Sequence, residues 1–161
     1  MKPARELILT CFLVCHATAA VAAPGDSTSN AGEPGDPVRE RAQDAQARGD
    51  WAAAQAVLRE AIAREPGKAD YHNLYAYAIR KGANPDMSLV FKHYNQALAL
   101  DPKHRGAHEY IGEAYLMVGN LPKAKEHLAR LDQLCFFSCR EYSDLKEAVA
   151  AYESRQASAG R

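Results

Sequence analysis

Apolar side chains recur at helical spacing from about residue 38 to residue 152. In the second half of each of three successive segments, four such positions are separated by three, four and three residues, which places them on one stripe of a helix. The three sets are Trp51, Ala54, Leu58 and Ala61; Met87, Val90, Tyr94 and Ala97; and Leu121, Ala124, Leu128 and Leu131. No strand-like alternation stands out, so the pattern predicts an all-α chain.

The first half of each segment repeats as well. A glycine stands between the two halves of every segment, and the same offsets before Gly49, Gly82 and Gly119 give a second series of helix-packing positions. These are Val38, Arg41, Ala42 and Ala45; Tyr71, Leu74, Tyr75 and Ala78; and His108, Ile111, Gly112 and Tyr115. Each segment is therefore predicted to be a helix, a tight turn and a second helix.

Turn and cap residues separate these predicted helices. We expect each of the three glycines to end a helix in the left-handed conformation, which a residue without a Cβ adopts easily. Asp50 and Asn120 are expected to cap the next helix, and Asn84 with Pro85 fills that role in the longer middle turn. Pro66 and Pro102, which are 36 residues apart, stop the second helix of the first two segments.

Three such units in one register resemble a tetratricopeptide repeat array, whose period is about 34 residues. The third unit matches best, because Gly112, Tyr115, Gly119, Ala124 and the Asp101–Pro102 pair stand where that family keeps its small, aromatic, turn, small and terminating residues. The first is the weakest, with Arg41 where a large apolar residue is usual. The resemblance implies helix pairs over residues 37–66, 67–102 and 103–135 in a right-handed superhelical array, whose core forms when neighbouring pairs stack.

A further helix is predicted over residues 138–155. Ser138 followed three residues later by Glu141 is a capping box. The apolar stripe of this helix is Tyr142, Leu145, Val149 and Tyr152, and its register continues the pattern of the first helices. We expect it to cap the third pair and close a domain over residues 37–155. Residues 156–161 are expected to be a disordered tail.

The first 36 residues are expected to lie outside the fold. Lys2 and Arg5, an apolar run over Leu7–Val14 that is too short to span a bilayer, and small residues after it have the order of a secretory signal peptide. Cleavage after residue 22 would leave residues 23–36 as a flexible linker that lacks large apolar side chains. The mature protein is therefore expected in the periplasm or outside the cell, without membrane insertion.

The four cysteines divide at this cleavage site. Cys11 and Cys15 would leave with the signal peptide; the competing hypothesis is a lipoprotein anchor at one of them, although neither follows a small residue. Cys135 and Cys139 remain, and an oxidising compartment favours a disulfide between them. The alternatives are a copper or zinc site with a histidine, or a regulatory thiol pair. Residues 134–146 also resemble the tail of a group of small exported bacterial tetratricopeptide proteins.

The sequence offers little for other chemistries. Twenty Lys and Arg balance twenty Asp and Glu, so charge gives no reason to expect nucleic acid or an anionic membrane as partner. The chain contains no H-E-x-x-H, C-x2-C, glycine-rich phosphate loop or G-x-S-x-G motif. His108 is expected to pack in the core rather than bind a metal, and Glu109 and Glu113 to be solvated rather than catalytic. We therefore expect neither enzymatic activity nor a cofactor or metal.

The resemblance instead implies a binding groove, because the first helices of such an array line its concave side. The residues it places there are Arg39, Gln43, Gln46, His72, Asn73, Ala76, Ile79, Glu109, Glu113 and Leu116. Asn73 matches an asparagine with which the family grips a peptide backbone, whereas the family's basic clamp for a terminal carboxylate is largely missing. We expect a protein–protein interaction adaptor that binds a peptide segment of mixed charge. The alternative function is a metal- or redox-handling protein that uses Cys135 and Cys139.

Overall fold

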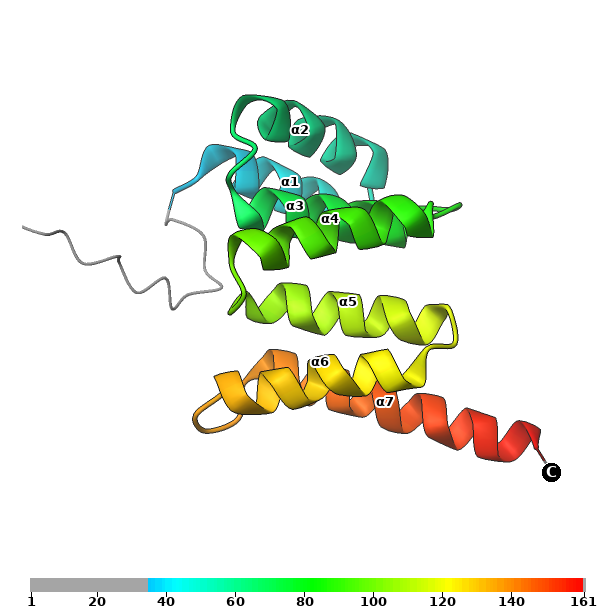
Figure 1. Ribbon diagram of the computed structural model, residues 1–161. Coiled ribbons are helices and arrows are strands. Elements are labelled where there is room, and N and C mark those ends of the chain that lie inside the picture. Colours follow the sequence, from blue (N-terminus) through cyan, green and yellow to red (C-terminus); the bar gives the residue numbers. More distant parts are fainter. Residues whose placement is uncertain (1–34, 161) are drawn as a thin grey trace, which may run out of the picture.

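The computed structural model describes residues 35–160, in which six helices are stacked as three antiparallel pairs and a seventh helix packs on the third pair (Figure 1). The helices are α1 (Pro37–Ala47), α2 (Trp51–Arg64), α3 (Ala69–Lys81), α4 (Met87–Leu100), α5 (Arg105–Met117), α6 (Leu121–Leu134) and α7 (Arg140–Ala159). The predicted all-α array of three helix pairs and a capping helix is confirmed. The expected signal peptide and the expected linker up to residue 34 lie outside the described residues.

The turns within the first and third pairs form as their residues predict. Gly49 and Gly119 have φ of +72° and +77°, the left-handed conformation expected of them. The side chain of Asp50 accepts a hydrogen bond from the backbone N–H of Ala53 at 3.0 Å, and that of Asn120 accepts one from Lys123 at 3.2 Å. Both predicted N-caps are therefore confirmed.

The turn of the middle pair differs from the prediction. Gly82 has φ of −67° and ψ of 169°, so it is extended and not left-handed. The cap is Asp86, whose carboxylate accepts from the N–H of Leu89 at 3.1 Å, and not Asn84. The physical reason is the length of this turn, because the extra residues carry the chain past Pro85 before α4 begins.

Both ends of α7 also differ from the prediction. Ser138 does not cap the helix: it has φ of 63°, and Cys139 is the N-cap residue without a side-chain hydrogen bond. At the other end the helix runs on to Ala159, so residues 156–159 are helical and not a disordered tail. Residues 140–159 contain no glycine or proline that would end the helix earlier, and the hydroxyl of Ser158 donates to the carbonyl of Ser154 at 2.9 Å.

Asp36 belongs to the fold, although the expected linker included it. Its carboxylate accepts from the N–H groups of Val38 and Arg39 at 2.9 and 3.2 Å, which caps α1. The same carboxylate accepts from the hydroxyl of Tyr71 on α3 at 2.8 Å. Asp36 is therefore tied to both α1 and α3.

The predicted apolar stripes form the core. Its largest fully buried side chains are Leu58, Val90, Tyr94, Ile111, Leu131 and Leu145. Each contributes about 1.5–3 kcal/mol relative to the same side chain left in water. Arg41, the position that fits the repeat least well, is exposed. Because these side chains come from all three pairs and from α7, no pair buries its apolar face alone.

Small residues set the closest helix approaches. Ala42, Ala54 and Ala124 are fully buried. The tightest described case is Gly112 on α5, where a Cβ would lie 2.6 Å from Cδ2 of Leu145 on α7. α7 therefore reaches the backbone of α5 and stands where the first helix of a fourth pair would stand.

Candidate binding groove

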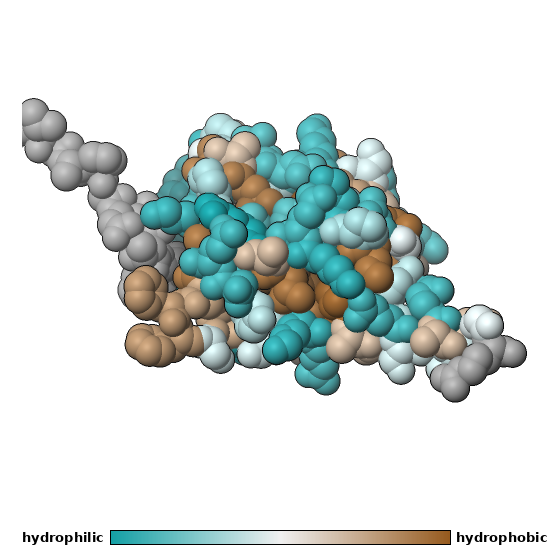
Figure 2. Space-filling model, turned by 60° about the horizontal axis from the view of Figure 1, so that its bottom comes forward, coloured by the Kyte–Doolittle hydropathy of each residue, from teal (hydrophilic) through white to brown (hydrophobic). Residues whose placement is uncertain are grey.

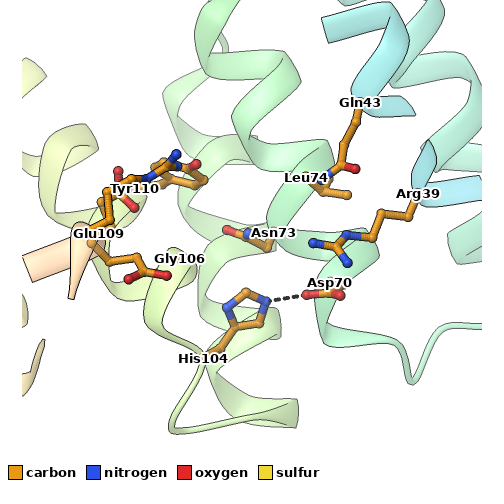
Figure 3. A pocket seen from close by; sticks show the side chains of 11 residues that line it. Arg39, Gln43, Asp70, Asn73, Leu74, His104, Gly106, Glu109 and Tyr110 are labelled. Atoms are coloured by element: carbon orange, nitrogen blue, oxygen red, sulfur yellow. Dashed lines mark hydrogen bonds and ion pairs between the residues drawn. The ribbon is translucent and has the colours of Figure 1, made fainter. Parts of the chain in front are cut away.

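The first helices of the three pairs and α7 form the inner face of the array. α1 contacts α3, α3 contacts α5, and α5 contacts α7. Two cavities open along this face. The first cavity, of about 150 Å³, is lined by Arg39, Gln43, Asp70, Asn73, Leu74, His104, Gly106, Glu109, Tyr110, Arg140 and Glu141 (Figure 3). The second cavity, of about 300 Å³, is lined by Arg80, Glu113, Leu116, Met117, Ala148, Ala151 and Arg155.

A buried histidine fixes one wall of the first cavity. His104 is the N-cap of α5, and its Nδ1 accepts from the N–H of Ala107 at 3.2 Å. Its Nε2 lies 2.9 Å from Oδ1 of Asp70 on α3, as the dashed line in Figure 3 marks. Because Nδ1 accepts, Nε2 carries the proton and donates to the carboxylate. This bond joins α3 to α5 at the cavity wall.

Two oxygen atoms at this cavity have no hydrogen-bond partner among the described residues. They are Oδ1 of Asn73 on α3 and Oε2 of Glu109 on α5. Both side chains are buried, with 5% and 3% of their residue surfaces exposed. Burial, together with the carboxylates of Glu113 and Asp144, raises the pKa of Glu109 to about 8. Unsatisfied buried acceptors are uncommon in folded proteins and mark this cavity as unusual.

A buried arginine organises the second cavity. Nη2 of Arg80 lies 2.6 Å from Oε2 of Glu113, and Nε donates to the hydroxyl of Tyr94 at 3.4 Å. The guanidinium carbon is 5.4 and 5.8 Å from the ring centres of Tyr77 and Tyr110, within cation–π range. The charge of Arg80 is thus engaged by α4 and α5, and the cavity beside it is lined largely by apolar side chains.

Two histidine pairs repeat within the array. Nδ1 of His72 lies 2.9 Å from Nδ1 of His93, and Nδ1 of His108 lies 2.9 Å from Nδ1 of His127. Nε2 of the first histidine of each pair lies 3.0 or 3.1 Å from a carbonyl oxygen, that of Pro66 or Pro102.

These bonds set the protonation of each pair. A carbonyl only accepts, so that Nε2 carries a proton, Nδ1 of the same ring accepts, and the partner histidine donates. Burial, followed by the charge of the other histidine, lowers the pKa of both His93 and His127 to about 4. The histidine pairs therefore join the two helices of a unit, with His93 and His127 as neutral rings at neutral pH.

Some of the predicted groove residues line one of the two cavities, and the others reach neither cavity. Those that line the first cavity are Arg39, Gln43, Asn73 and Glu109, and those that line the second are Glu113 and Leu116. Gln46, His72 and Ile79 reach neither cavity: Gln46 donates to the carbonyl of Leu74 at 3.2 Å, and Ile79 is packed in the core with Ala76. His72 is engaged by α4 instead. These side chains contact neighbouring helices, although the resemblance had placed them on the open face of the groove.

Sequence reasoning missed the part of the groove that α7 supplies. Arg140 and Glu141 line the first cavity, and Ala148, Ala151 and Arg155 line the second. Asp70 and His104 were missed as well, since their pairing joins residues far apart in the chain. The signal for α7 was present in the sequence, because its apolar stripe has the register of a first helix.

Cys135 and Cys139 form a disulfide between α6 and α7, with their Sγ atoms 1.97 Å apart, as predicted. In this form neither sulfur is a thiolate, the species that binds metals. No group of three or more metal-ligating side chains occurs within residues 35–160. Phe136 and Phe137 in the closed loop are 97% and 88% exposed, and Figure 2 shows apolar surface at that corner.

The stacked helix pairs and the groove along their first helices define a helical-repeat protein with the tetratricopeptide fold. No protein-family model and no curated protein matches the chain. Among solved structures, the type III secretion translocator chaperone SycD of Yersinia enterocolitica matches with a TM-score of 0.64 and 14% identity, over 74% of this chain and 83% of SycD. None of the helices in the described part of the chain is both long and apolar enough to cross a membrane.

Two further structures share the fold. The first tetratricopeptide domain of Spaghetti (RPAP3), bound to the HSP90 peptide SRMEEVD, matches with a TM-score of 0.59 and 18% identity, over 71% of this chain and 91% of that domain. The first such domain of human RPAP3 matches with a TM-score of 0.59 and 19% identity, over 73% and 93%. At these identities the likeness shows the fold.

Proposed function

We propose that the protein is an exported interaction adaptor that binds a peptide or protein segment in the groove along α1, α3, α5 and α7. The observation that carries this proposal is the pair of adjacent cavities on one face, one of which holds buried polar atoms that have no hydrogen-bond partner within residues 35–160. Such a surface is suited to a ligand that completes its hydrogen bonds. The peptide bound to the Spaghetti domain supports a peptide as the ligand class.

The first test is capture of binding partners. The double variant Arg39→Glu, Asn73→Ala changes two residues that line the first cavity. Its matched control is Lys92→Glu, Asn95→Ala, at two exposed positions on the second helix of the middle pair. We expect the cavity variant to lose partners that the wild type and the control both capture. Identical sets of captured proteins from all three would reject the groove.

The proposed location is the periplasm or the extracellular medium. It rests on the order of charged, apolar and small residues at the start of the chain. Mass spectrometry of the protein from the periplasmic fraction should find a chain that begins at Ala23. Recovery of the full-length chain from the cytoplasm would contradict export.

A further inference from the structure

The groove of this protein contains two buried side-chain oxygen atoms that face the same space from neighbouring helices. Asn73 and Glu109 both line the first cavity, and Figure 3 shows their polar ends turned into the space between α3 and α5. Oδ1 of Asn73 and Oε2 of Glu109 have no donor among the described residues. A buried polar atom left without a partner costs about 1–3 kcal/mol, so a ligand that supplies N–H groups to both oxygen atoms would recover that free energy.

The charges around Glu109 decide what kind of donor fits. On its own helix Glu113 adds negative charge, and on α7 Glu141 and Asp144 do the same. Arg140 opposes them, but it is exposed and already lies 3.5 Å from the carboxylate of Asp144. Glu113 is itself paired with Arg80 at 2.6 Å, and Glu141 lies 3.9 Å from Arg105. The charge that attracts a positively charged donor is therefore mainly that of the ionised carboxylate of Glu109 itself.

The remaining walls leave this preference intact. Asp70 on α3 is held by His104, which donates to it at 2.9 Å. Arg39 extends toward Asp70 from α1, at the opposite side of the cavity from Glu109 (Figure 3). The cavity volume of about 150 Å³ is well above the roughly 10–15 Å³ that one water needs, and it is enough for the end of one side chain.

We propose that Asn73 and Glu109 form a receptor for a nitrogen-borne positive charge, namely the ammonium or guanidinium group of a segment bound in the groove. The proposal rests on the proposed function and names the partner chemistry of that site. The source of the charge is a lysine or arginine side chain or a free amino terminus. The second cavity begins one helical turn further along α5, where Leu116 and Met117 would receive an apolar side chain of the same segment.

Binding of such a group exchanges one positive charge for another. With its pKa raised to about 8, the carboxyl of Glu109 holds a proton at neutral pH when the groove is empty. A bound ammonium or guanidinium favours the carboxylate, so the proton leaves to solvent as the cation arrives. Association at pH 7 should therefore release close to one proton, about the amount that a group of this pKa carries there.

The test uses an array of random octapeptides with both ends blocked and a second array with free amino termini. Full-length mature protein is applied as wild type, as Glu109→Gln and as the control Glu126→Gln, whose carboxylate is exposed and pairs with Lys123 at 2.7 Å. We expect wild type and control to select lysine or arginine at one fixed position, or a free terminus on the second array. Glu109→Gln keeps the shape and should lose that preference, with at least tenfold weaker binding of the selected peptide.

Calorimetry of the selected peptide in two buffers of different ionisation enthalpy measures the released proton. Release by the wild type and none by Glu109→Gln supports the receptor. Selection of acidic peptides, absence of any charge preference, or an unchanged preference in Glu109→Gln overturns it while the groove itself stands. Failure of the wild type to bind any peptide on either array overturns the groove as well. A melting curve of Glu109→Gln, which should match the wild type, confirms that the variant is folded.

Discussion

Arg80 is a buried cation whose neutralisation depends on one side chain of the next unit. Glu113 lies 2.6 Å away with a side chain that is 28% exposed, while that of Arg80 is 6% exposed. The two members of the pair therefore differ in their access to water. Loss of the carboxylate leaves a charge inside the protein, whereas loss of the guanidinium leaves a carboxylate that solvent can reach.

This asymmetry gives the first prediction. Glu113→Ala should lower the free energy of unfolding by about 2–3 kcal/mol, below the range for fully buried pairs because Glu113 is partly exposed. Arg80→Met, which keeps the volume and removes the charge, should lower it by about 1 kcal/mol. Urea denaturation of both variants measures the difference. Equal effects would mean that the pair matters little beyond its packing.

The repeated histidine pairs predict loss of stability in mild acid. The pKa values of His93 and His127 are lowered from 6.5 to about 4, so the unfolded chain binds protons at a higher pH than the folded chain. Their stabilising contribution is complete above about pH 6.5 and is lost as the pH falls toward 4.

The measurement is the melting temperature between pH 7.5 and 4. The variant His93→Asn, His127→Asn keeps a donor in place of Nδ1 but does not titrate, so its curve should be flatter across this window. The carboxylates titrate in both proteins, which is why the comparison and not the absolute slope is decisive. Parallel curves would show that the histidine pairs are not the titrating groups.

At the scale of single elements, the contact between α5 and α7 depends on the absence of one methyl group. Gly112→Ala places a carbon 2.6 Å from the side chain of Leu145, which is fully buried between α5 and α6. We predict a loss of about 1–2 kcal/mol, although alanine is the better helix former by about 1 kcal/mol.

A double-mutant cycle isolates this contact. In a Leu145→Ala background the same change at position 112 should be neutral or stabilising, because the clash is gone and the helix propensity remains. If Gly112→Ala costs as much in that background, the loss arises elsewhere and α7 does not press on α5.

The disulfide joins α6 to α7 but closes only a short loop. Mature protein isolated without reductant should show no free thiol after denaturation, and its mass should rise by two alkyl groups only after reduction. A free thiol or a bound metal in that sample would instead favour the metal- or redox-handling alternative.

Reduction of the disulfide should lower the free energy of unfolding by about 2 kcal/mol or less, from the loop-length relation for five residues. α7 should remain docked, since Leu145 and Val149 are packed against α5 and α6.

The helices themselves could be predicted from the sequence because their cause is local. Spacing of three and four residues puts Val90, Tyr94 and Ala97 on one stripe wherever the helix lies, and the structure buries all three. The conformations of Gly82 and Ser138 have a different cause. Gly82 lies in a turn whose length sets the path of the backbone, and Ser138 lies inside the disulfide loop. The local preference of these residues therefore did not determine their conformations.

The groove could be predicted only in part, for a reason that lies at the scale of the whole molecule. Helix periodicity shows which residues share a face, but the angle between stacked units decides which of them reach the open side. Asn73 and Glu109 reach it, whereas His72 and Ile79, on the same helix as Asn73, are used in packing against neighbouring helices. The contribution of α7 depends on its docking in the place of a first helix.

Removal of α7 should therefore affect both folding and binding. A chain that stops after Ser138 exposes Gly112 and the apolar side chains that pack around Leu131. We predict aggregation or a broad, uncooperative thermal transition, because a terminal unit without a cap presents an open apolar face. Circular dichroism and size-exclusion chromatography measure this outcome. A monomeric, sharply melting product would show that the third pair closes the array by itself.

Since α7 occupies the site of a first helix, the contact between the third pair and α7 is the same kind of contact that joins one pair to the next. Further helix pairs could therefore be inserted before α7. A second copy of residues 103–134 placed directly before Cys135 would pack its first helix against α5, as α7 does now, and would present the same surface to α7. The lengthened chain would gain one more histidine pair and one more stretch of groove. The segment that the groove can bind would then be longer by a corresponding number of residues, so the number of helix pairs would set the length of the bound segment.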